Sequence, residues 1–385
     1  MNNFIYNIPT KVYFGENQLC NLGKEVSRFG KRVLLVYGGG SIKRNGLYNR
    51  VVQELMLAGE EIYELSGVDP NPRVETVRTG AKICQDRMID VVLAVGGGSV
   101  IDCSKFIAAA TYYNGDAWDL SSKNVEVTKC LPIVTILTLS ATGSEMDDCG
   151  VITNLRTNDK LGKHHKLMQP KVSFLDPTLT YTVNAYQTAC GAADILSHLF
   201  EVYFNLNKDL EMLDGFMEAM MKTVIKFAPI AIAEPTNYEA RANLMWASSW
   251  AINGFIVGGK QQAWSCHPME HQLSAVYDIT HGLGLAILTP RWMRYYLNDK
   301  TLDKFCQFAI NVFGVNKNIS KMEIALKGID KLEDFLFGSL NLTRRLSALG
   351  IDDSHFKEMA QKAATNNAFQ PMTAVDVENI YRMCL

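Results

Sequence analysis

The sequence predicts an α/β domain with a parallel sheet over residues 1–185 and an all-helical domain over residues 186–385. Two observations support this division. In the first half of the chain, short apolar runs that end in glycine alternate with amphipathic stretches, which is typical of strand–helix–strand units. In the second half, long amphipathic stretches follow one another and no strand-like run stands out. A chain of 385 residues is long enough for two such domains.

Continuous aliphatic or aromatic runs predict strands that are buried on both faces of a parallel sheet. The two clearest runs each end in three glycines and a serine. Helices are expected where apolar residues recur at helical spacing. The expected strands are residues 33–37, 91–95, 133–137 and 172–175. The expected helices are residues 47–55, 101–110, 192–203, 210–227, 240–253, 269–277 and 324–346.

Composition excludes several classes of protein. The net charge of −2 provides no basic surface for nucleic acid, and no apolar run approaches the ~18 residues of a membrane span. The first residues lack the basic and apolar regions of a secretion signal. Nine cysteines, an odd number with no CxxC pair, indicate buried thiols in a reducing compartment. We therefore expect a cytoplasmic protein without nucleic-acid or membrane partners.

The two glycine-rich loops predict a site for a phosphate-containing ligand. Gly96-Gly97-Gly98-Ser99 lies between a predicted strand and a predicted helix. Glycine allows the backbone to approach an anion, and the helix N-terminus adds free N–H groups and partial positive charge. The spacing is not the standard G-x-G-x-x-G, so a tight turn that only packs a helix on the sheet is the alternative.

The loop Gly38-Gly39-Gly40-Ser41 is positioned to meet the adenosine ribose of a dinucleotide. NAD-selective sites usually place an acidic residue there, which repels a 2′-phosphate. This loop contains no acidic residue, and Lys43 and Arg44 follow it. We therefore hypothesise that NADP(H) is tolerated and is even the preferred cofactor.

Histidine and aspartate residues in the second half predict a metal site. Asp194 and His198 are four residues apart, as are His267 and His271, and this spacing places each pair on one helix face. His281 precedes the next predicted helix. One carboxylate and three imidazoles without a thiolate suit Fe²⁺ or Zn²⁺ better than Ca²⁺ or Mg²⁺. Spacing alone leaves open whether His267 and His271 both bind the metal or one relays protons.

Five stretches together resemble the iron-containing alcohol dehydrogenase family, in particular its NAD(P)H-dependent butanol dehydrogenase branch. The likeness covers nearly the whole chain. It implies a Rossmann-like, dinucleotide-binding α/β domain and a helical domain of the dehydroquinate synthase-like fold. The stretches are residues 37–43, 94–102, 139–145, 191–198 and 265–271.

The resemblance also implies roles for individual residues. Asp194, His198, His267 and His281 would bind the metal, and His271 would be a catalytic proton-relay residue beside the nicotinamide. The cofactor would be NAD(H) or NADP(H), with one Fe²⁺ or Zn²⁺. The expected cofactor contacts are Gly39, Gly40, Ser41, Asn71, Gly97, Gly98, Ser99, Asp102, Thr138, Thr142, Ser144, Val151 and Lys160.

The activity implied by the resemblance is hydride transfer between NAD(P)H and short aliphatic aldehydes or primary alcohols, such as butanal and butanol. Residues 263–284 contain no Arg or Lys that could bind a substrate phosphate or carboxylate. A metal- and nucleotide-dependent lyase of the dehydroquinate synthase-like fold is therefore the weaker alternative. Members of the family usually form dimers, and a predicted strand at residues 10–13 could pair between subunits. We expect a homodimer.

Overall fold

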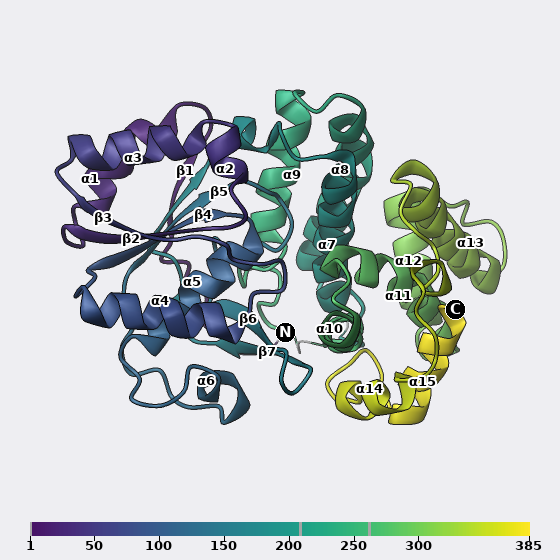
Figure 1. Ribbon diagram of the computed structural model, residues 1–385. Coiled ribbons are helices and arrows are strands. Elements are labelled where there is room, and N and C mark those ends of the chain that lie inside the picture. The colour runs from purple at the N-terminus through teal and green to yellow at the C-terminus, as the bar shows by residue number, and fades with distance from the viewer. Residues whose placement is uncertain (1, 208–209, 261–262) are drawn as a thin grey trace. The chain divides into compact units, whose positions relative to one another are not determined.

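The computed structural model describes residues 2–207, 210–260 and 263–385. The chain forms two compact units. One comprises residues 7–183, and the other comprises residues 184–385 together with the N-terminal residues 2–6. The first unit is built around a sheet and the second is helical (Figure 1). The predicted fold class, a parallel-sheet α/β region followed by a helical region, is confirmed.

A parallel six-stranded sheet in the order β1-β8-β5-β4-β2-β3 forms the centre of the first unit. Every residue of β4, β5 and β8 is buried. This burial explains why these strands are mainly apolar, because both faces of a central strand in such a sheet are covered. The strands are β1 (Lys11–Phe14), β2 (Arg32–Tyr37), β3 (Glu61–Leu65), β4 (Val91–Gly96), β5 (Ile133–Leu137) and β8 (Val172–Leu175).

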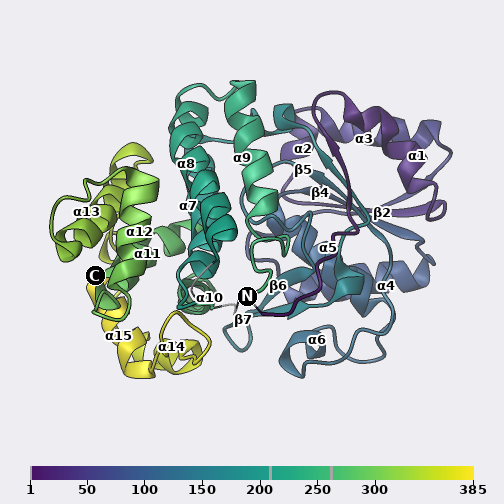
Figure 2. The same ribbon diagram turned by 180° about the vertical axis from the view of Figure 1, so that it is seen from behind.

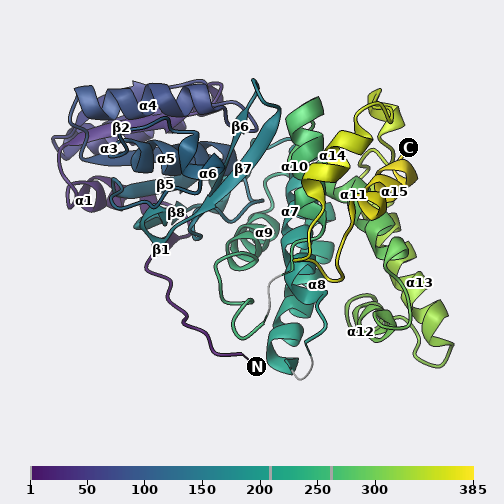
Figure 3. The same ribbon diagram turned by 90° about the horizontal axis from the view of Figure 1, so that it is seen from below.

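Helices cover both faces of this sheet. In Figure 1, α1 and α3 lie over one face, and α4 and α5 lie over the other. A separate antiparallel hairpin of β6 and β7 adjoins α5, and its two strands run side by side in Figure 3. The elements are α1 (Leu22–Val26), α2 (Ser41–Arg44), α3 (Leu47–Leu57), α4 (Val74–Asp86), α5 (Gly98–Ala110), α6 (Asp119–Ser122), β6 (Cys149–Asn154) and β7 (Asp159–His164).

The second unit packs its helices around a single large apolar core. Its helices α7, α8 and α9 lie side by side (Figure 2). Within the described residues, no helix combines the length and apolar character needed to cross a membrane. The helices are α7 (Ala185–Tyr203), α8 (Glu211–Ala233), α9 (Tyr238–Trp250), α10 (Cys266–Tyr277), α11 (His281–Tyr295), α12 (Leu302–Phe313), α13 (Lys321–Glu333), α14 (Phe356–Ala363) and α15 (Ala374–Met383).

Several elements differ from the sequence-based expectation, and α4, α12, α14 and α15 were not predicted. The helix predicted over residues 324–346 is too long, because α13 ends at Glu333 and a π-helical turn, Asp334–Ser339, follows it. The predictions also missed β3 and the β6–β7 hairpin. All three strands are partly exposed, β3 and β7 carry charged residues and β6 ends in polar ones, so they lack the continuous apolar run that marks a central strand.

Candidate functional site

Helix α7 carries three buried acidic or histidine side chains on one face. Asn184 begins this helix, because its side-chain oxygen accepts a hydrogen bond from the backbone N–H of Gln187 at 2.8 Å. Asp194, His198 and Glu201 follow at helical spacing, and each is no more than 5% exposed. Buried groups of this kind must have partners. The partners of these three come from α10 and α11.

Glu201 holds the first turn of α10. Its carboxylate accepts hydrogen bonds from the backbone N–H groups of Ser265 (2.5 Å), Cys266 (2.8 Å) and His267 (2.8 Å). A helix N-terminus has such unpaired donors and a partial positive charge, so a carboxylate is stabilised there. The same carboxylate lies 2.9 Å from Nδ1 of His267. This contact orients the imidazole so that Nε2 lies 4.0 Å from Oδ1 of Asp194.

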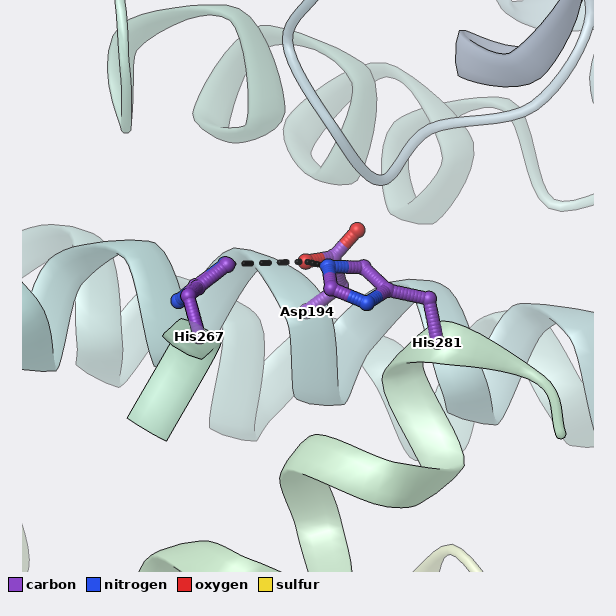
Figure 4. A group of neighbouring side chains, drawn as sticks. All are labelled: Asp194, His267 and His281. Atoms are coloured by element: carbon purple, nitrogen blue, oxygen red, sulfur yellow. Dashed lines mark ion pairs between the residues drawn. The ribbon is translucent and has the colours of Figure 1, made fainter. Parts of the chain in front are cut away.

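Glu270 has the same role for His281, the first residue of α11. Oε2 of Glu270 is hydrogen-bonded to Nδ1 of His281, and its Oε1 accepts a hydrogen bond from the hydroxyl of Ser274. The imidazole of His281 therefore presents Nε2 to Asp194, 3.8 Å from Oδ1. Figure 4 shows the imidazoles of His267 and His281 on either side of the Asp194 carboxylate.

These side chains meet the requirements of a divalent-cation site. One oxygen of Asp194 lies 3.7 to 4.0 Å from a nitrogen of each of three imidazoles. Ligand atoms about 2.1 Å from a shared tetrahedral ion lie about 3.4 Å apart, so a small contraction would suffice. Among the described residues, His198 Nδ1 and His267 Nε2 are buried and make no hydrogen bond. The donor set of imidazoles and one carboxylate fits Fe²⁺ or Zn²⁺.

The four predicted metal ligands are not equally close. The ligand atoms of Asp194, His267 and His281 all lie within 4.8 Å of one another. His198 adjoins this group, and its ring stacks on that of His267 with the centroids 4.7 Å apart. Burial, together with the charges of the neighbouring histidines, lowers the pKa of His198 well below its usual value. A neutral imidazole is the form that binds a metal.

His271 flanks the same group from the next turn of α10. Its ring centroid lies 6.3 Å from that of His267 and 5.7 Å from that of His281. It also forms a second compact group with His281 and Glu270. Glu270 already contacts His281 and Ser274 with its two oxygens, which is the arrangement of a carboxylate that orients a ligand. The group of Asp194, His267 and His281 is therefore the better candidate for the cation site.

One tryptophan borders the imidazoles. The ring of Trp264 meets His267 edge-on, with the centroids 5.1 Å apart, and approaches His198 at 6.5 Å. Trp250 and Phe255, by contrast, pack against each other. Trp264 thus supplies an apolar surface beside the candidate cation site.

Gly282 allows α11 to approach α7 closely. A Cβ atom at this position would lie 2.0 Å from the carbonyl oxygen of Cys190. We expect Gly282→Ala to destabilise the protein by about 1–3 kcal/mol through overpacking and to reduce metal content. Gly215→Ala in α8 is the matched control, since nothing lies within 4 Å of its Cβ position. Thermal melting and metal analysis test this, and equal behaviour of the two variants would contradict it.

In the first unit, the glycine loop after β4 packs closely against the stretch 139–145, which also contains predicted cofactor residues. A Cβ atom on Gly98 would lie 2.3 Å from the hydroxyl oxygen of Thr142. Gly97 and Gly98 begin α5 at the carboxyl end of β4, and Thr138 donates its backbone N–H to the carbonyl of Gly96 at 3.0 Å. Position 98 therefore requires glycine, and the loop retains the bare backbone that a pyrophosphate needs.

Further predicted cofactor residues contact one another in the same unit. The carboxylate of Asp102 accepts hydrogen bonds from the hydroxyl of Ser144 at 2.6 Å and from the backbone N–H of Val151 at 3.0 Å. Burial raises the pKa of Asp102 against the opposing charge of Lys105. Lys160 donates a hydrogen bond to the side chain of Asn71 at 2.9 Å. Asp102 therefore holds Ser144 and Val151, two other predicted cofactor residues, beside α5.

Ser99 lies in the first turn of α5, next to Gly98, and three further predicted cofactor residues, Gly39, Gly40 and Ser41, follow β2 at the same edge of the sheet. Gly40 has a φ of 92°, which favours glycine, and Ser41 begins the short helix α2. The loop after β3 joins this loop, because the backbone N–H of Gly67 bonds to the carbonyl of Gly38 at 3.2 Å. Both glycine loops thus lie at the carboxyl ends of adjacent parallel strands, where ligands of doubly wound sheets bind.

Glu201 and Glu270 were not predicted from the sequence as functional residues. A signal was present for both. Glu201 continues the face defined by Asp194 and His198, and Glu270 immediately precedes His271. Metal-binding histidines usually donate their second ring nitrogen to a carboxylate or carbonyl, so acidic residues near such histidines merit attention.

Comparison with known proteins gives a consistent result along the chain. A family model described as iron-containing alcohol dehydrogenase matches residues 9–177, and the C-terminal model of the Fe-containing alcohol dehydrogenase family matches residues 188–385. NADH-dependent butanol dehydrogenase A of Clostridium acetobutylicum is 52% identical, covering 99% of both chains. NADPH-dependent aldehyde reductase YqhD of Escherichia coli is 36% identical, covering 94% of this chain and 93% of the relative. The crystal structure of NADH-dependent butanol dehydrogenase A from Thermotoga maritima has a TM-score of 0.95 at 37% identity, covering 100% of this chain and 99% of that one.

Proposed function

Because the chain belongs to the iron-containing alcohol dehydrogenase family, we propose that Asp194, His198, His267 and His281 hold one divalent cation, Fe²⁺ or Zn²⁺. The observation that carries this proposal is the approach of three imidazole nitrogens to one oxygen of Asp194 at 3.7 to 4.0 Å. Glu201 and Glu270 support it, because each holds Nδ1 of one histidine and so directs Nε2 toward Asp194.

The chain is an NAD(P)H-dependent oxidoreductase that interconverts alcohols and aldehydes. Its substrates, on our proposal, are short aliphatic aldehydes and primary alcohols such as butanal and butanol. Two relatives that are 52% and 49% identical are named butanol dehydrogenases, which supports this chain length. The apolar ring of Trp264 beside the imidazoles and the absence of Arg and Lys from residues 263–284 also favour an uncharged substrate.

The protein residues position the reactants and move the proton. When bound, the cation polarises the carbonyl oxygen, and the nicotinamide supplies the hydride. His271 flanks the metal group on α10, so its imidazole is the group proposed to transfer a proton to or from the substrate oxygen. Trp264 lies against the rings of His267 and His198, and on this proposal it would shield that side of the imidazoles from water.

The cofactor, NAD(H) or NADP(H), is proposed to bind the first unit, which corresponds to the domain expected over residues 1–185; residues 186–385 would bind metal and substrate. Gly98 and its bare backbone support the pyrophosphate position. The proposed contacts remain Gly39, Gly40, Ser41, Asn71, Gly97, Gly98, Ser99, Asp102, Thr138, Thr142, Ser144, Val151 and Lys160.

We further propose that the enzyme acts in the cytoplasm as a homodimer. The nine cysteines are all free thiols in the structure, which suits a reducing compartment. Strand β1 is the terminal strand of the sheet order, and edge strands pair readily with another chain.

Removal of the metal tests the proposed function. The protein is purified without oxygen, its metal content is measured, and oxidation of NADH and NADPH is followed with butanal. We expect about one Fe²⁺ or Zn²⁺ per chain, loss of activity after chelation and recovery when either ion is added back. Undiminished butanal reduction by metal-free protein would contradict the proposal.

A further inference from the structure

The loop that is expected to meet the adenosine ribose lies next to an acidic residue from another strand. Glu64 stands near the end of β3, which pairs in parallel with β2, and Tyr37 is the last residue of β2 before the glycine loop. The hydroxyl of Tyr37 donates a hydrogen bond to Oε2 of Glu64 at 2.7 Å, and that of Tyr48 donates one to Oε1 at 2.5 Å. Two tyrosines thus hold the Glu64 carboxylate beside the loop.

Lys43, which follows the glycine loop in α2, is drawn into this cluster. Its ammonium group lies 3.7 Å from Oε2 of Glu64. It also lies over both tyrosine rings, 5.0 Å from the centroid of Tyr37 and 4.5 Å from that of Tyr48. The lysine that the sequence suggested as a partner for a 2′-phosphate is therefore already paired with a carboxylate.

The charges of this cluster are stable at neutral pH. Burial tends to raise the pKa of Glu64, but the hydrogen bonds from Tyr37 and Tyr48 and the charge of Lys43 lower it overall. The pKa of Lys43 is raised, chiefly through Tyr37. Glu64 is about two-fifths exposed and Lys43 about half exposed, so both face solvent at the edge where the ribose would bind.

We infer that Glu64 determines the cofactor preference: held by Tyr37 and Tyr48, it neutralises Lys43 and repels a 2′-phosphate, so that the enzyme favours NADH over NADPH. This inference rests on the proposed position of the cofactor in the first unit. A 2′-phosphate carries about −1.5 to −2 charges at neutral pH, whereas the ribose of NADH is uncharged there. Glu64 of the neighbouring strand β3 thereby takes the place of the acidic residue that NAD-selective sites usually carry near the ribose and that this glycine loop lacks.

Charge removal at position 64 tests the inference. Dissociation constants of NADH and NADPH are measured on the full-length, metal-loaded protein by tryptophan fluorescence, together with kcat/KM for butanal reduction. Glu64→Gln keeps a carbonyl oxygen that accepts from one tyrosine hydroxyl, while its amide N–H can donate to the hydroxyl oxygen of the other. It should raise the preference for NADPH by about tenfold or more. The change should come from a lower dissociation constant for NADPH, while the dissociation constant for NADH changes by no more than about twofold.

Three further variants separate this effect from a general change of charge. Glu61→Gln alters the same strand about 10 Å away and should leave the preference within about twofold. In the double variant Glu64→Gln/Lys43→Gln the gain should disappear, because Lys43 is the group that Glu64→Gln releases. Lys43→Gln alone retains the tyrosine hydrogen bonds to Glu64 but removes the charge that Glu64 neutralises, so it should weaken NADPH binding below that of the wild type. This variant tests the inference independently if Glu64→Gln folds poorly.

The results distinguish the inference from the proposed function. If the wild-type protein binds neither dinucleotide, the proposed cofactor site is wrong and the inference falls with it. If NADH binds normally and the preference of Glu64→Gln stays within about twofold of the wild type, only the inference is overturned. Adenosine 2′,5′-bisphosphate provides an independent probe, since its affinity should rise in Glu64→Gln while that of AMP stays constant.

Discussion

His267→Ala is expected to lose its divalent metal and its turnover together, whereas His271→Ala should keep the metal and lose turnover. His267 points Nε2 at Asp194 and is held by Glu201, so its removal deletes a proposed ligand and takes away the imidazole that both α7 carboxylates contact. His271 lies outside the tight group of Asp194, His267 and His281. Its loss removes a proton-transfer group, which typically contributes 10²–10⁴-fold to the rate.

Metal analysis and kcat measurements on the same preparations decide this prediction. His355→Ala is the matched control, because this histidine is exposed on the same unit and contacts Tyr277 instead of the metal group. It should retain both metal and activity. The opposite pattern, with His271→Ala free of metal and His267→Ala still loaded, would show that the ligand assignment is wrong.

Glu201→Gln should weaken metal binding by about 10–100-fold, because Glu201 orients His267 without contacting the metal itself. It should also lower the stability of the protein by about 3 kcal/mol, since the carboxylate accepts three backbone hydrogen bonds at the start of α10. A glutamine cannot accept all of these bonds, and its amide N–H groups would face backbone donors. Metal affinity is measured by competition with a chelator, and stability by thermal melting.

Glu218→Gln provides the comparison for this effect. Glu218 is also buried in the helical unit, where its carboxylate accepts hydrogen bonds from Tyr203, Gln307 and Asn311. We expect this variant to be destabilised while its metal affinity is unchanged. If Glu201→Gln and Glu218→Gln bind metal equally well, Glu201 only caps α10 and does not position His267.

The local part of the fold could be predicted because its signals lie within a few residues. The central strands β2, β4, β5 and β8 each coincide with a mainly apolar run, since both faces of these strands are buried. The buried polar residues of β5 and β8, Thr135 and Ser173, are hydrogen-bonded to each other. Strand β3 escaped prediction because it lies at the sheet edge and only its last residue, Leu65, is buried. The helix α13 was predicted to be too long for a different reason. Apolar residues continue at helical spacing past Glu333, although the α-helix ends there and a π-helical turn begins.

The sequence alone determined which residue types stand on each helix face, because the spacing of Asp194 and His198, or of His267 and His271, depends only on the pitch of an α-helix. It equally determined the glycine loops at the ends of two buried strands. Only the tertiary structure decided which charged groups meet. The contacts of Glu201 with His267, of Asp194 with His281 and of Lys43 with Glu64 join residues 66, 87 and 21 positions apart. Such pairings follow from how helices and strands pack, which no local periodicity encodes, and they changed Lys43 from a phosphate-binding candidate into half of an ion pair.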